Sequence, residues 1–281
     1  MPTFLPYFIL FNLLFFVHTI CANPAPDLNT TVCFNLNVAL SDGTSSFEIE
    51  LFDHSASNVV RTTPTTAANF LTYIEEGLFD GTIFHRLVPG FVLQGGGYTW
   101  PSVNQFQAGG VPLPIEKYAP IINEPGNLNL AGTLAMAKIS GDPNSATSGW
   151  FVNLVDNPEL DTQNGGFTVF GRVTSGMELI NQIATLNLYS LSGVFYYNPP
   201  FTDLPLQGTL ESIVLNNQQY TLLQPFNYIA IVSVEILNRK SGQLKVLKSE
   251  DLSNWSEVKT INFQNLNPNT VFLKSELILE D

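Results

Sequence analysis

The sequence is short of the residues that build disulfides and metal sites. Its 281 residues include two cysteines and three histidines. Cys21 lies in an apolar N-terminal run, and without that run Cys33 has no partner for an internal disulfide. We interpret Cys33 as a small core residue rather than a reactive thiol. The histidines are scattered rather than set at metal-ligand spacing, and they are His18, His54 and His85. We therefore expect neither a bound metal nor a cofactor.

Positive charge is also scarce. The chain has 11 Lys and Arg residues against 24 Asp and Glu residues, which gives a net charge of −13. Such a chain repels phosphate backbones and anionic membranes, so nucleic acid is not expected as a partner. Charged residues make up only 12% of the chain and aromatic residues another 12%, which argues against a disordered protein. The composition is that of a folded, loop-rich, mainly β protein.

The first 22 residues contain an uninterrupted apolar run. Residues 4–22 read FLPYFILFNLLFFVHTICA and include no Asp, Glu, Lys or Arg. A run of this kind that ends in small residues is typical of a secretory signal peptide, and we expect cleavage after Ala22. The alternative is an uncleaved membrane anchor, although Asn12 and His18 lie inside the run. We therefore expect the mature protein to be secreted or periplasmic.

The next segments alternate between strand and helix patterns. Residues 31–40 and 47–51 alternate apolar and polar side chains on either side of a Ser-Asp-Gly turn, which predicts a hairpin. Thr63 and Pro64 then indicate a helix start, with Thr63 as the N-cap, and Gly77 marks the helix end. Short strands follow at 83–88, 91–94, 134–137, 150–154 and 168–173, before a second helix that bears Met177, Ile180 and Ile183.

Together these elements predict a closed antiparallel barrel with two helices at its ends. Two segments, 212–215 and 228–236, are candidates for the closing strand, and we favour the second because it is longer and more β-branched. The tail, 238–281, alternates again but is too short for a large core of its own. We expect it to be a small β-rich appendage that packs on the main domain or pairs with something else.

Several motifs in the middle of the chain resemble one known family. They are AANF at 67–70, FHRLVPGFVLQGG at 84–96, GTLAMA at 132–137, SATS at 145–148 and VFG at 169–171. In this order they resemble the cyclophilins, over about residues 30–190, and the likeness is strongest to the bacterial secreted branch. The resemblance implies an eight-stranded cyclophilin-like barrel over 30–237. It also implies a monomeric peptidyl-prolyl cis-trans isomerase (rotamase) that acts on proline-containing polypeptides and assists protein folding.

The chemistry of prolyl isomerisation makes few demands. Rotating a peptide bond breaks its resonance against a barrier of roughly 18–20 kcal/mol, and no covalent bond is made or cut. A catalyst therefore needs an apolar slot for the proline ring and a fixed donor that favours the twisted amide over the planar one. A guanidinium aimed at the proline nitrogen meets this need, because twisting localises the lone pair on that atom.

The resemblance supplies residues for each part. It implies that Arg86, Phe91 and Gln94 are the catalytic residues, with Arg86 as the donor and Gln94 bonded to the substrate backbone. Phe91 would line the proline pocket with further substrate-binding residues, which are Val92, Phe151, Leu160 and Phe167. Ala137 and Lys138 would border the groove for the residue that precedes proline. Strand alternation turns His85 away from Arg86, so we interpret His85 as structural.

The sequence departs from the family pattern at several positions. Gly149 stands where the family commonly has Gln, and Trp150 replaces the Phe that follows. Glu159 replaces a Trp linked to tight cyclosporin binding, so we expect weak inhibition by that drug. Phe167 replaces the His of eukaryotic members and keeps the slot apolar. An insertion at 55–62 has the default interpretation of a surface loop.

Two further hypotheses about function stay open in addition to the isomerase hypothesis. A cyclophilin fold with a degraded groove would bind proline-containing segments with little turnover, which Gly149 and Glu159 favour. Alternatively, the tail would carry the biological role as an attachment or interaction segment, because its strands bear aromatic residues.

Overall fold

The computed structural model describes residues 29–54, 60–99, 112–190, 201–209, 211–215, 218–222, 225–238, 242–248 and 256–263. Residues 27–239 form one compact unit, and the strands β15 (Gly242–Lys248) and β16 (Ser256–Phe263) belong to a second unit, in which they pair antiparallel. The expected signal peptide, 1–22, and most of the expected insertion, 55–62, lie outside the described residues. No helix within the described residues has the length and apolarity needed to cross a membrane.

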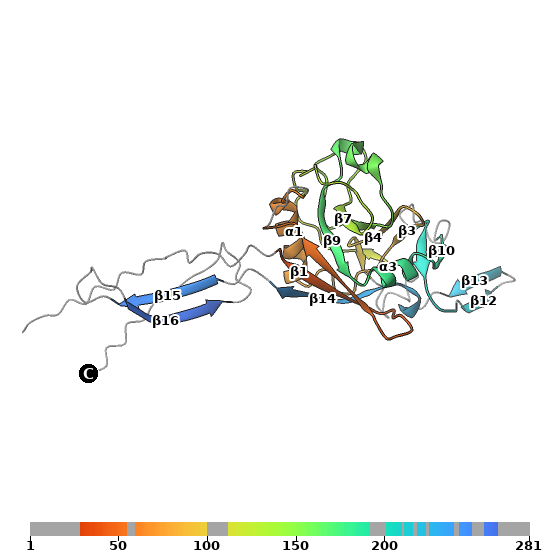
Figure 1. The fold of residues 1–281 in the computed structure, drawn as a ribbon. Helices are drawn as coiled ribbons and strands as arrows, with labels where there is room; N and C mark the ends of the chain where they lie inside the picture. Colours follow the sequence, from red (N-terminus) through yellow and green to blue (C-terminus); the bar gives the residue numbers. More distant parts are fainter. Residues whose placement is uncertain are drawn as a thin grey trace, which may run out of the picture. The chain divides into compact units, whose positions relative to one another are not determined.

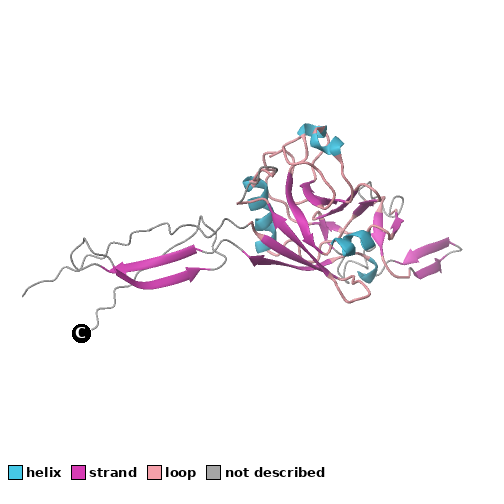
Figure 2. Ribbon diagram, in the orientation of Figure 1, coloured by secondary structure: helices cyan, strands magenta, loops and turns pink. Residues whose placement is uncertain are grey.

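The first unit is built mainly of short antiparallel strands, with helices at its margins (Figures 1 and 2). Its strands are β1 (Thr31–Leu36), β2 (Ser46–Leu51), β3 (Arg86–Val88), β4 (Val92–Gly95), β5 (Tyr98–Thr99), β6 (Leu113–Pro114), β7 (Thr133–Met136), β8 (Trp150–Asn153), β9 (Val169–Ser175), β10 (Asn187–Tyr189), β11 (Leu204–Leu206), β12 (Glu211–Leu215), β13 (Gln218–Leu222) and β14 (Ile231–Asn238). The α-helices among the described residues are α1 (Pro64–Glu75) and α3 (Met177–Ile183), and the 3-10 turns are η1 (Pro158–Asp161), η2 (Gln163–Gly165) and η3 (Pro225–Asn227).

The main sheet has eight strands in the order β14-β1-β2-β9-β7-β8-β4-β3. It is an open half-barrel, so the expectation of a closed barrel was wrong. The edge strands β3 and β14 share no ladder. The residues just before β3 nevertheless bond to the start of β14, because the Gly81 N–H donates to the Ile231 carbonyl at 2.8 Å and the Ile231 N–H donates to the Thr82 carbonyl at 2.7 Å. The free edge of β3 is used elsewhere, because the Leu87 N–H donates to the Asp203 carbonyl at 2.8 Å. The segment before β11 therefore covers part of the β3 edge.

The last strand of the sheet is the one favoured by its sequence. β14 pairs antiparallel with β1 along its length. The competing segment, β12, pairs instead with β13 in a separate hairpin. The longer, more β-branched run thus joins the main sheet, while the shorter run forms a local pair.

Alternation along the strands builds the core. In β1 and β2 every second side chain is buried, and Phe34 stacks on its cross-strand partner Phe47 at 4.8 Å between ring centroids. The same alternation turns Cys33 to the outer face, where it is half-buried. The interpretation of Cys33 as a core residue was therefore wrong, because its neighbours Val32 and Phe34 occupy the inward positions. Burial, followed by Glu48 and Glu235, raises the thiol pKa, so this cysteine is no reactive thiolate.

The two helices cover the core from outside the sheet. On α1 the buried positions Ala67, Phe70 and Ile74 recur at helical spacing, and on α3 Ile180 and Ile183 do the same. Pro64 begins α1 as expected, and Gly77, with a φ of 66°, lies in the turn after it.

The N-terminus of α1 is capped from a distant loop. Thr63 makes no side-chain capping bond, which corrects the sequence interpretation. Instead, the Glu124 carboxylate accepts the N–H groups of Thr65 and Thr66 and the Thr66 hydroxyl. A carboxylate at this end also complements the positive pole of the helix dipole.

Candidate functional site

Three neighbouring strands present two different faces. The inward face carries Leu93, Val152 and Leu134, which are opposite one another in β4, β8 and β7 and lie in the main core. The outward face carries the side chains that alternate with these along each strand. Along it, one row of cross-strand partners runs Arg86, Gln94, Phe151 and Ala135. Cross-strand partners share a face of the sheet, so this row brings a guanidinium, an amide and an aromatic ring to one surface.

The outward face holds a second apolar cluster, separate from the main core. Val92, Phe151 and Leu160 are buried in it, and Phe91, Ala137 and Phe167 pack against it. All the apolar residues expected at the site therefore lie together. The cluster also contains residues that the sequence interpretation missed, namely Phe52, Val60, Ala135 and Val169. Ala135 and Val169 lie inside two of the motifs, so strand alternation within those motifs was the signal that identifies them.

The two polar members of the row lie at the margin of this cluster. Arg86 and Gln94 are both half-buried. The Arg86 guanidinium forms no ion pair with any carboxylate in the described ranges. A guanidinium is always charged and offers five N–H donors. Its charge thus lies beside an apolar surface without a neutralising partner among the described residues. A hydrogen bond from such a charged donor to a ligand is stronger than one between neutral groups.

A tight turn sets the position of Phe91. Pro89 and Gly90 form the turn between β3 and β4, with Gly90 at a φ of 69°, and the Phe91 N–H donates to the Val88 carbonyl at 3.0 Å. The Phe91 carbonyl in turn accepts the Leu154 N–H at 2.9 Å and the Asn157 side-chain amide at 3.1 Å. Both ends of this residue are therefore fixed, which holds its ring at the edge of the cluster.

A chain of polar side chains lies behind Phe91. Asn157 donates to the Asn153 side chain at 2.8 Å, and Asn153 donates to the Asn129 side chain at 3.2 Å. Asn129 completes the chain by donating to the Asp161 carboxylate, with its backbone N–H at 2.8 Å and its amide at 2.9 Å. The chain links the Phe91 backbone to η1, which carries Leu160. Sequence reasoning missed this network, because asparagines in loops are ordinarily read as turn formers.

The turn after η1 brings Phe167 to the pocket. The Phe167 N–H donates to the Leu160 carbonyl at 2.8 Å, and its ring meets Phe151 edge-on at 5.8 Å between centroids. Asn164 adopts a positive φ of 50°, a conformation that Asn tolerates better than most residues. The Asn164 amide ties the turn to the opposite loop by donating to the Ile139 carbonyl at 2.9 Å.

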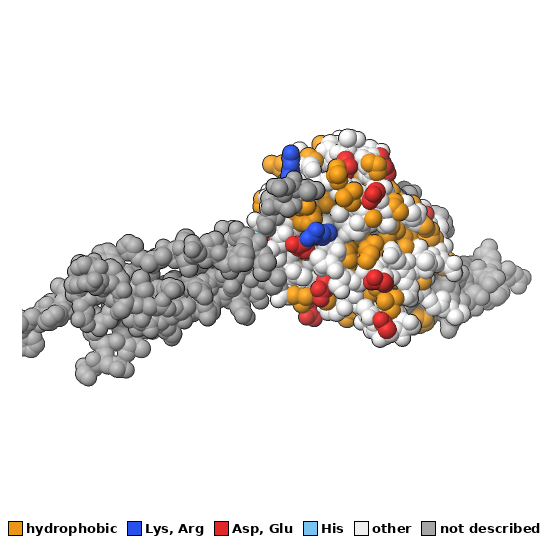
Figure 3. All heavy atoms as spheres, viewed as in Figure 1, with side chains coloured by type: hydrophobic (Ala, Val, Ile, Leu, Met, Phe, Trp, Pro, Cys, Tyr) orange, Lys and Arg blue, Asp and Glu red, His pale blue; other side chains and the backbone are white. Residues whose placement is uncertain are grey.

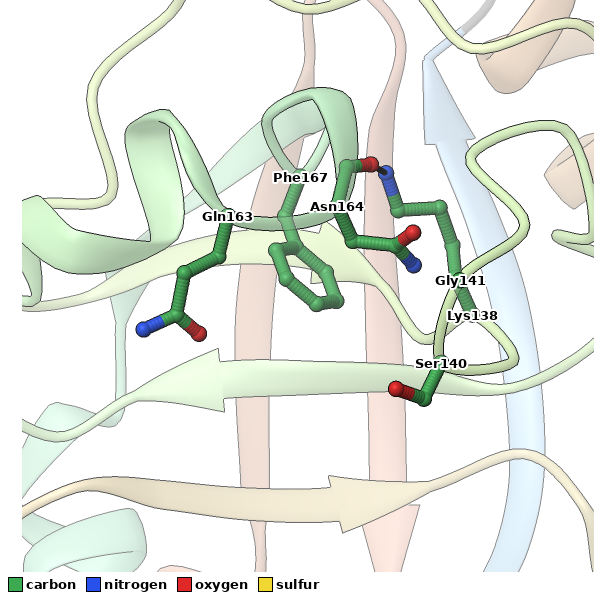
Figure 4. A pocket seen from close by; sticks show the side chains of 6 residues that line it. All are labelled: Lys138, Ser140, Gly141, Gln163, Asn164 and Phe167. Atoms are coloured by element: carbon green, nitrogen blue, oxygen red, sulfur yellow. Dashed lines mark hydrogen bonds between the residues drawn. The ribbon is translucent and has the colours of Figure 1, made fainter.

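Lys138 reaches across from that opposite loop. Its ammonium donates to the Asn164 carbonyl at 2.8 Å and the Gly166 carbonyl at 2.7 Å, and it lies 4.7 Å from the centroid of the Phe167 ring. Burial lowers the pKa of this ammonium below its ordinary value. A hollow of about 410 Å³ opens here (Figure 4), and its lining residues are Lys138, Ser140, Gly141, Gln163, Asn164 and Phe167.

The structure shows where two of the residues that depart from the family pattern lie. The Gly149 carbonyl accepts the Ala137 N–H at 2.9 Å, and a Cβ at Gly149 would lie 3.4 Å from the Ala137 Cβ. The space beside the cluster therefore admits a side chain that the sequence does not supply. Glu159 is exposed on η1, one residue before the buried Leu160.

Trp150 points the other way, into the main core, where it is fully buried. A Cβ on Gly96 would collide with the Trp150 ring and the Ser148 carbonyl. The second glycine of the Gly95-Gly96 pair is required by these contacts together with its positive φ of 75°.

His85 is buried on the side away from Arg86, as its strand position indicated. It is 2% exposed, and its ring meets Tyr98 edge-on at 4.8 Å between centroids. Burial lowers the pKa of His85 to about 4, with nearby Arg86 and Lys117 adding to the effect. The imidazole is neutral at physiological pH, which fits a structural role. In the described part of the chain no group of three or more His, Cys, Asp or Glu side chains is arranged to hold a metal ion.

Comparisons with known proteins identify the family of this chain. The family model described as "Cyclophilin type peptidyl-prolyl cis-trans isomerase/CLD" matches residues 36–198. A peptidyl-prolyl cis-trans isomerase of Acinetobacter baylyi is 37% identical over 156 residues, which cover 54% of this chain and 73% of the relative. Peptidyl-prolyl cis-trans isomerase A of Dickeya dadantii is 35% identical over 174 residues, which cover 61% of this chain and 82% of the relative.

The chain therefore belongs to the cyclophilin-type peptidyl-prolyl cis-trans isomerases, and the predicted family and enzyme class are confirmed. Among solved structures, a cyclophilin-type isomerase of Cryptosporidium parvum aligns with a TM-score of 0.46 at 21% identity, covering 75% of this chain and 99% of that one.

Proposed function

We propose that this protein accelerates rotation about X-Pro peptide bonds with the Arg86 guanidinium as the donor. The observation that carries the proposal is the row Arg86, Gln94 and Phe151, which share one face of the sheet. As the amide twists, its resonance is lost and the lone pair localises on the proline nitrogen. A fixed cationic donor at that nitrogen stabilises the twisted state more than the planar one, and so lowers the barrier.

The apolar cluster is the proposed slot for the proline ring. Phe91, Val92, Phe151, Leu160 and Phe167 would enclose the ring and exclude water from the twisting bond. Exclusion of water strengthens the charged hydrogen bond from Arg86, because competing solvent is removed. The Gln94 amide, which has no described side-chain partner of its own, would bond the substrate backbone and fix the position of the bond relative to the guanidinium. Ala137 and Lys138 would border the path of the residue that precedes proline.

The wider setting is part of the same proposal. We place the protein in the bacterial secreted branch of the family, outside the cytoplasm after removal of residues 1–22, where it would assist the folding of secreted proteins as a monomer. The apolar run at 4–22 and the motif likeness support this setting. Prolyl rotation requires neither metal nor cofactor, and the acidic chain is a poor partner for nucleic acid.

The test is a prolyl-isomerisation assay on a short X-Pro peptide with the mature chain and two variants. Arg86→Ala removes the donor, and we expect kcat/KM to fall by roughly 10²–10³-fold. Arg172→Ala is the matched control, because Arg172 is exposed on β9 and pairs with Glu50 at 2.6 Å, away from the site. Unchanged turnover in Arg86→Ala, with the fold intact by circular dichroism, would contradict the proposed role.

A second candidate function is a cyclophilin-fold module that binds proline-containing segments with little turnover. Gly149 favours it, because the groove lacks a side chain at a position where there is space for one. Measured binding of a Pro-containing peptide without acceleration of its isomerisation would support this alternative. Turnover comparable to that of other family members would exclude it. A role for the tail, 238–281, as an attachment segment stays a separate hypothesis, to be tested by deletion and localisation of the shortened protein.

A further inference from the structure

Lys138 is a cation held by two backbone carbonyls. No described carboxylate forms an ion pair with its ammonium, and burial is the sole cause of its lowered pKa. Its two protein acceptors are the neutral carbonyls of Asn164 and Gly166. An ammonium has three N–H donors, so one remains after these two bonds. A partly desolvated ammonium with an unused donor is a favourable place for a carboxylate.

The hollow beside Lys138 has otherwise neutral walls. Gln163, Asn164 and Phe167 line it from one side, while Lys138, Ser140 and Gly141 line it from the opposite loop (Figure 4). The nearest acidic residue along that loop is Asp142, which is exposed and whose carboxylate accepts the Asn144 N–H at 3.0 Å. Glu159 is exposed on the preceding turn, and the Asp161 carboxylate is engaged by Asn129. Lys138 is therefore the charged group that lines the hollow itself.

The loop that carries Lys138 is held in place by its own bonds. The Ile139 N–H donates to the Ser145 hydroxyl at 2.7 Å, and that hydroxyl donates to the Asp142 carbonyl at 2.7 Å. Asn164 adds the bond to the Ile139 carbonyl from the far side. A fixed wall limits the entropy that ordering would cost when a ligand enters.

Phe167 joins this hollow to the apolar cluster. Its ring lies 4.7 Å from the Lys138 ammonium on one side and 5.8 Å from the Phe151 ring on the other, measured to ring centroids. Consecutive Cα atoms are about 3.8 Å apart, and a glutamate side chain extends well beyond its Cα. A residue next to a proline that occupies the cluster would thus have the ammonium within reach.

We propose that this hollow is an acidic-side-chain subsite in which Lys138 selects substrates with Glu or Asp next to the proline. The inference rests on the proposed function, because it takes the apolar cluster as the proline site. The proposed preference for acidic substrates is opposite to the one that the overall charge would produce. The chain carries a net charge of −13, which by itself would favour basic substrates. On the face drawn in Figure 3, acidic groups are dispersed and basic groups are sparse.

The test compares short peptides with Glu, Gln or Lys immediately before or after a single proline. Exposed ion pairs are worth up to about fivefold in affinity, so we expect wild type to turn over the Glu peptide up to about fivefold more efficiently than its Gln counterpart on one side of the proline. Lys138→Met should abolish the Glu/Gln ratio, and Lys138→Arg should retain it. Lys117→Met, which removes the same charge from an exposed position, should leave it unchanged.

The ratio of Glu-peptide to Gln-peptide turnover is measured within each variant. A general loss of activity, caused by loosening of the Asn164–Gly166 turn, would lower both rates equally and leave this ratio unchanged. High salt should shrink the wild-type ratio, because it screens the charge. Equal turnover of Glu and Gln peptides by wild type, or a ratio that persists in Lys138→Met, would overturn the subsite. If no peptide is turned over, the proposed function fails. The dissociation constants of the same Glu and Gln peptides then test the subsite separately. Tighter binding of the Glu peptide would support it, and equal binding would overturn it.

Discussion

Arg86 lies directly opposite Gln94 in the antiparallel pair of β3 and β4, and Gln94 lies directly opposite Phe151 of β8. The register of three short strands therefore sets the spacing between the proposed donor, the proposed backbone anchor and the apolar slot. A β-strand register fixes side-chain positions more firmly than a loop does, because a slip of one residue would turn every side chain to the other face. A site built in this way depends on backbone pairing that single substitutions leave intact.

Gln94→Ala should weaken catalysis without unfolding the protein. Gln94 is half-buried and its side chain has no hydrogen-bond partner among the described residues, so its loss leaves no described group unsatisfied. Removing a bond to the substrate backbone should lower kcat/KM by about tenfold. Isomerisation kinetics on an X-Pro peptide measure the effect, and thermal melting provides the control. A variant with a wild-type kcat/KM would show that Gln94 does not contact the substrate.

Gly149→Gln should increase activity. A Cβ at this position would lie 3.4 Å from the Ala137 Cβ, so the backbone admits a side chain with little adjustment. The added amide would offer one more hydrogen bond along the groove, which predicts a rise in kcat/KM of roughly two- to tenfold. Gly149→Ala adds the Cβ without the amide and should leave kcat/KM near the wild-type value. Equal effects of the two substitutions would attribute any gain to backbone rigidity instead.

Cyclosporin should inhibit this protein weakly, and Glu159→Trp should strengthen the inhibition. Glu159 is exposed one residue before the buried Leu160, so an indole at that position would lie at the surface beside the apolar cluster. A tryptophan offers a large apolar area and an N–H donor, where a carboxylate offers only charge. Inhibition curves on the same X-Pro peptide measure the change, with Glu178→Trp on α3 as the matched control. No difference between the two variants would remove position 159 from drug binding.

The sequence predicted the local elements well, because they follow from periodicity. Alternation in β1 and β2 and helical spacing in α1 and α3 appear in the structure where they were expected. The same alternation should have excluded Cys33 from the core, since it separates the two inward residues Val32 and Phe34. The family motifs, rather than periodicity, identified the residues that meet in the outward cluster.

What the sequence did not predict depends on contacts between distant segments. At the edge of the sheet, Leu87 bonds to Asp203, and no local pattern encodes that contact. The cap of α1 comes from Glu124, about sixty residues from the helix start, as the bonds to Thr65 and Thr66 show. The asparagine chain behind Phe91 is likewise assembled from separate segments, namely the end of β8 and two loops. In each case a polar group is satisfied by a partner that only the fold brings near.

The stability of the protein should fall on mild acidification because of His85. Burial lowers the pKa of its imidazole from 6.5 to about 4, so the unfolded chain takes up the proton first as the pH falls. The contribution of the neutral, buried ring is therefore complete above pH 6.5 and is lost progressively as the pH falls toward 4. Between pH 7.5 and 4.5 the loss should be roughly 2–3 kcal/mol. His85→Phe keeps an aromatic ring against Tyr98 and cannot be protonated, so urea unfolding at both pH values should show a smaller loss for this variant. Because the carboxylates titrate in both proteins, the difference between them isolates His85, and identical losses would show that the imidazole is already charged or solvated in the fold.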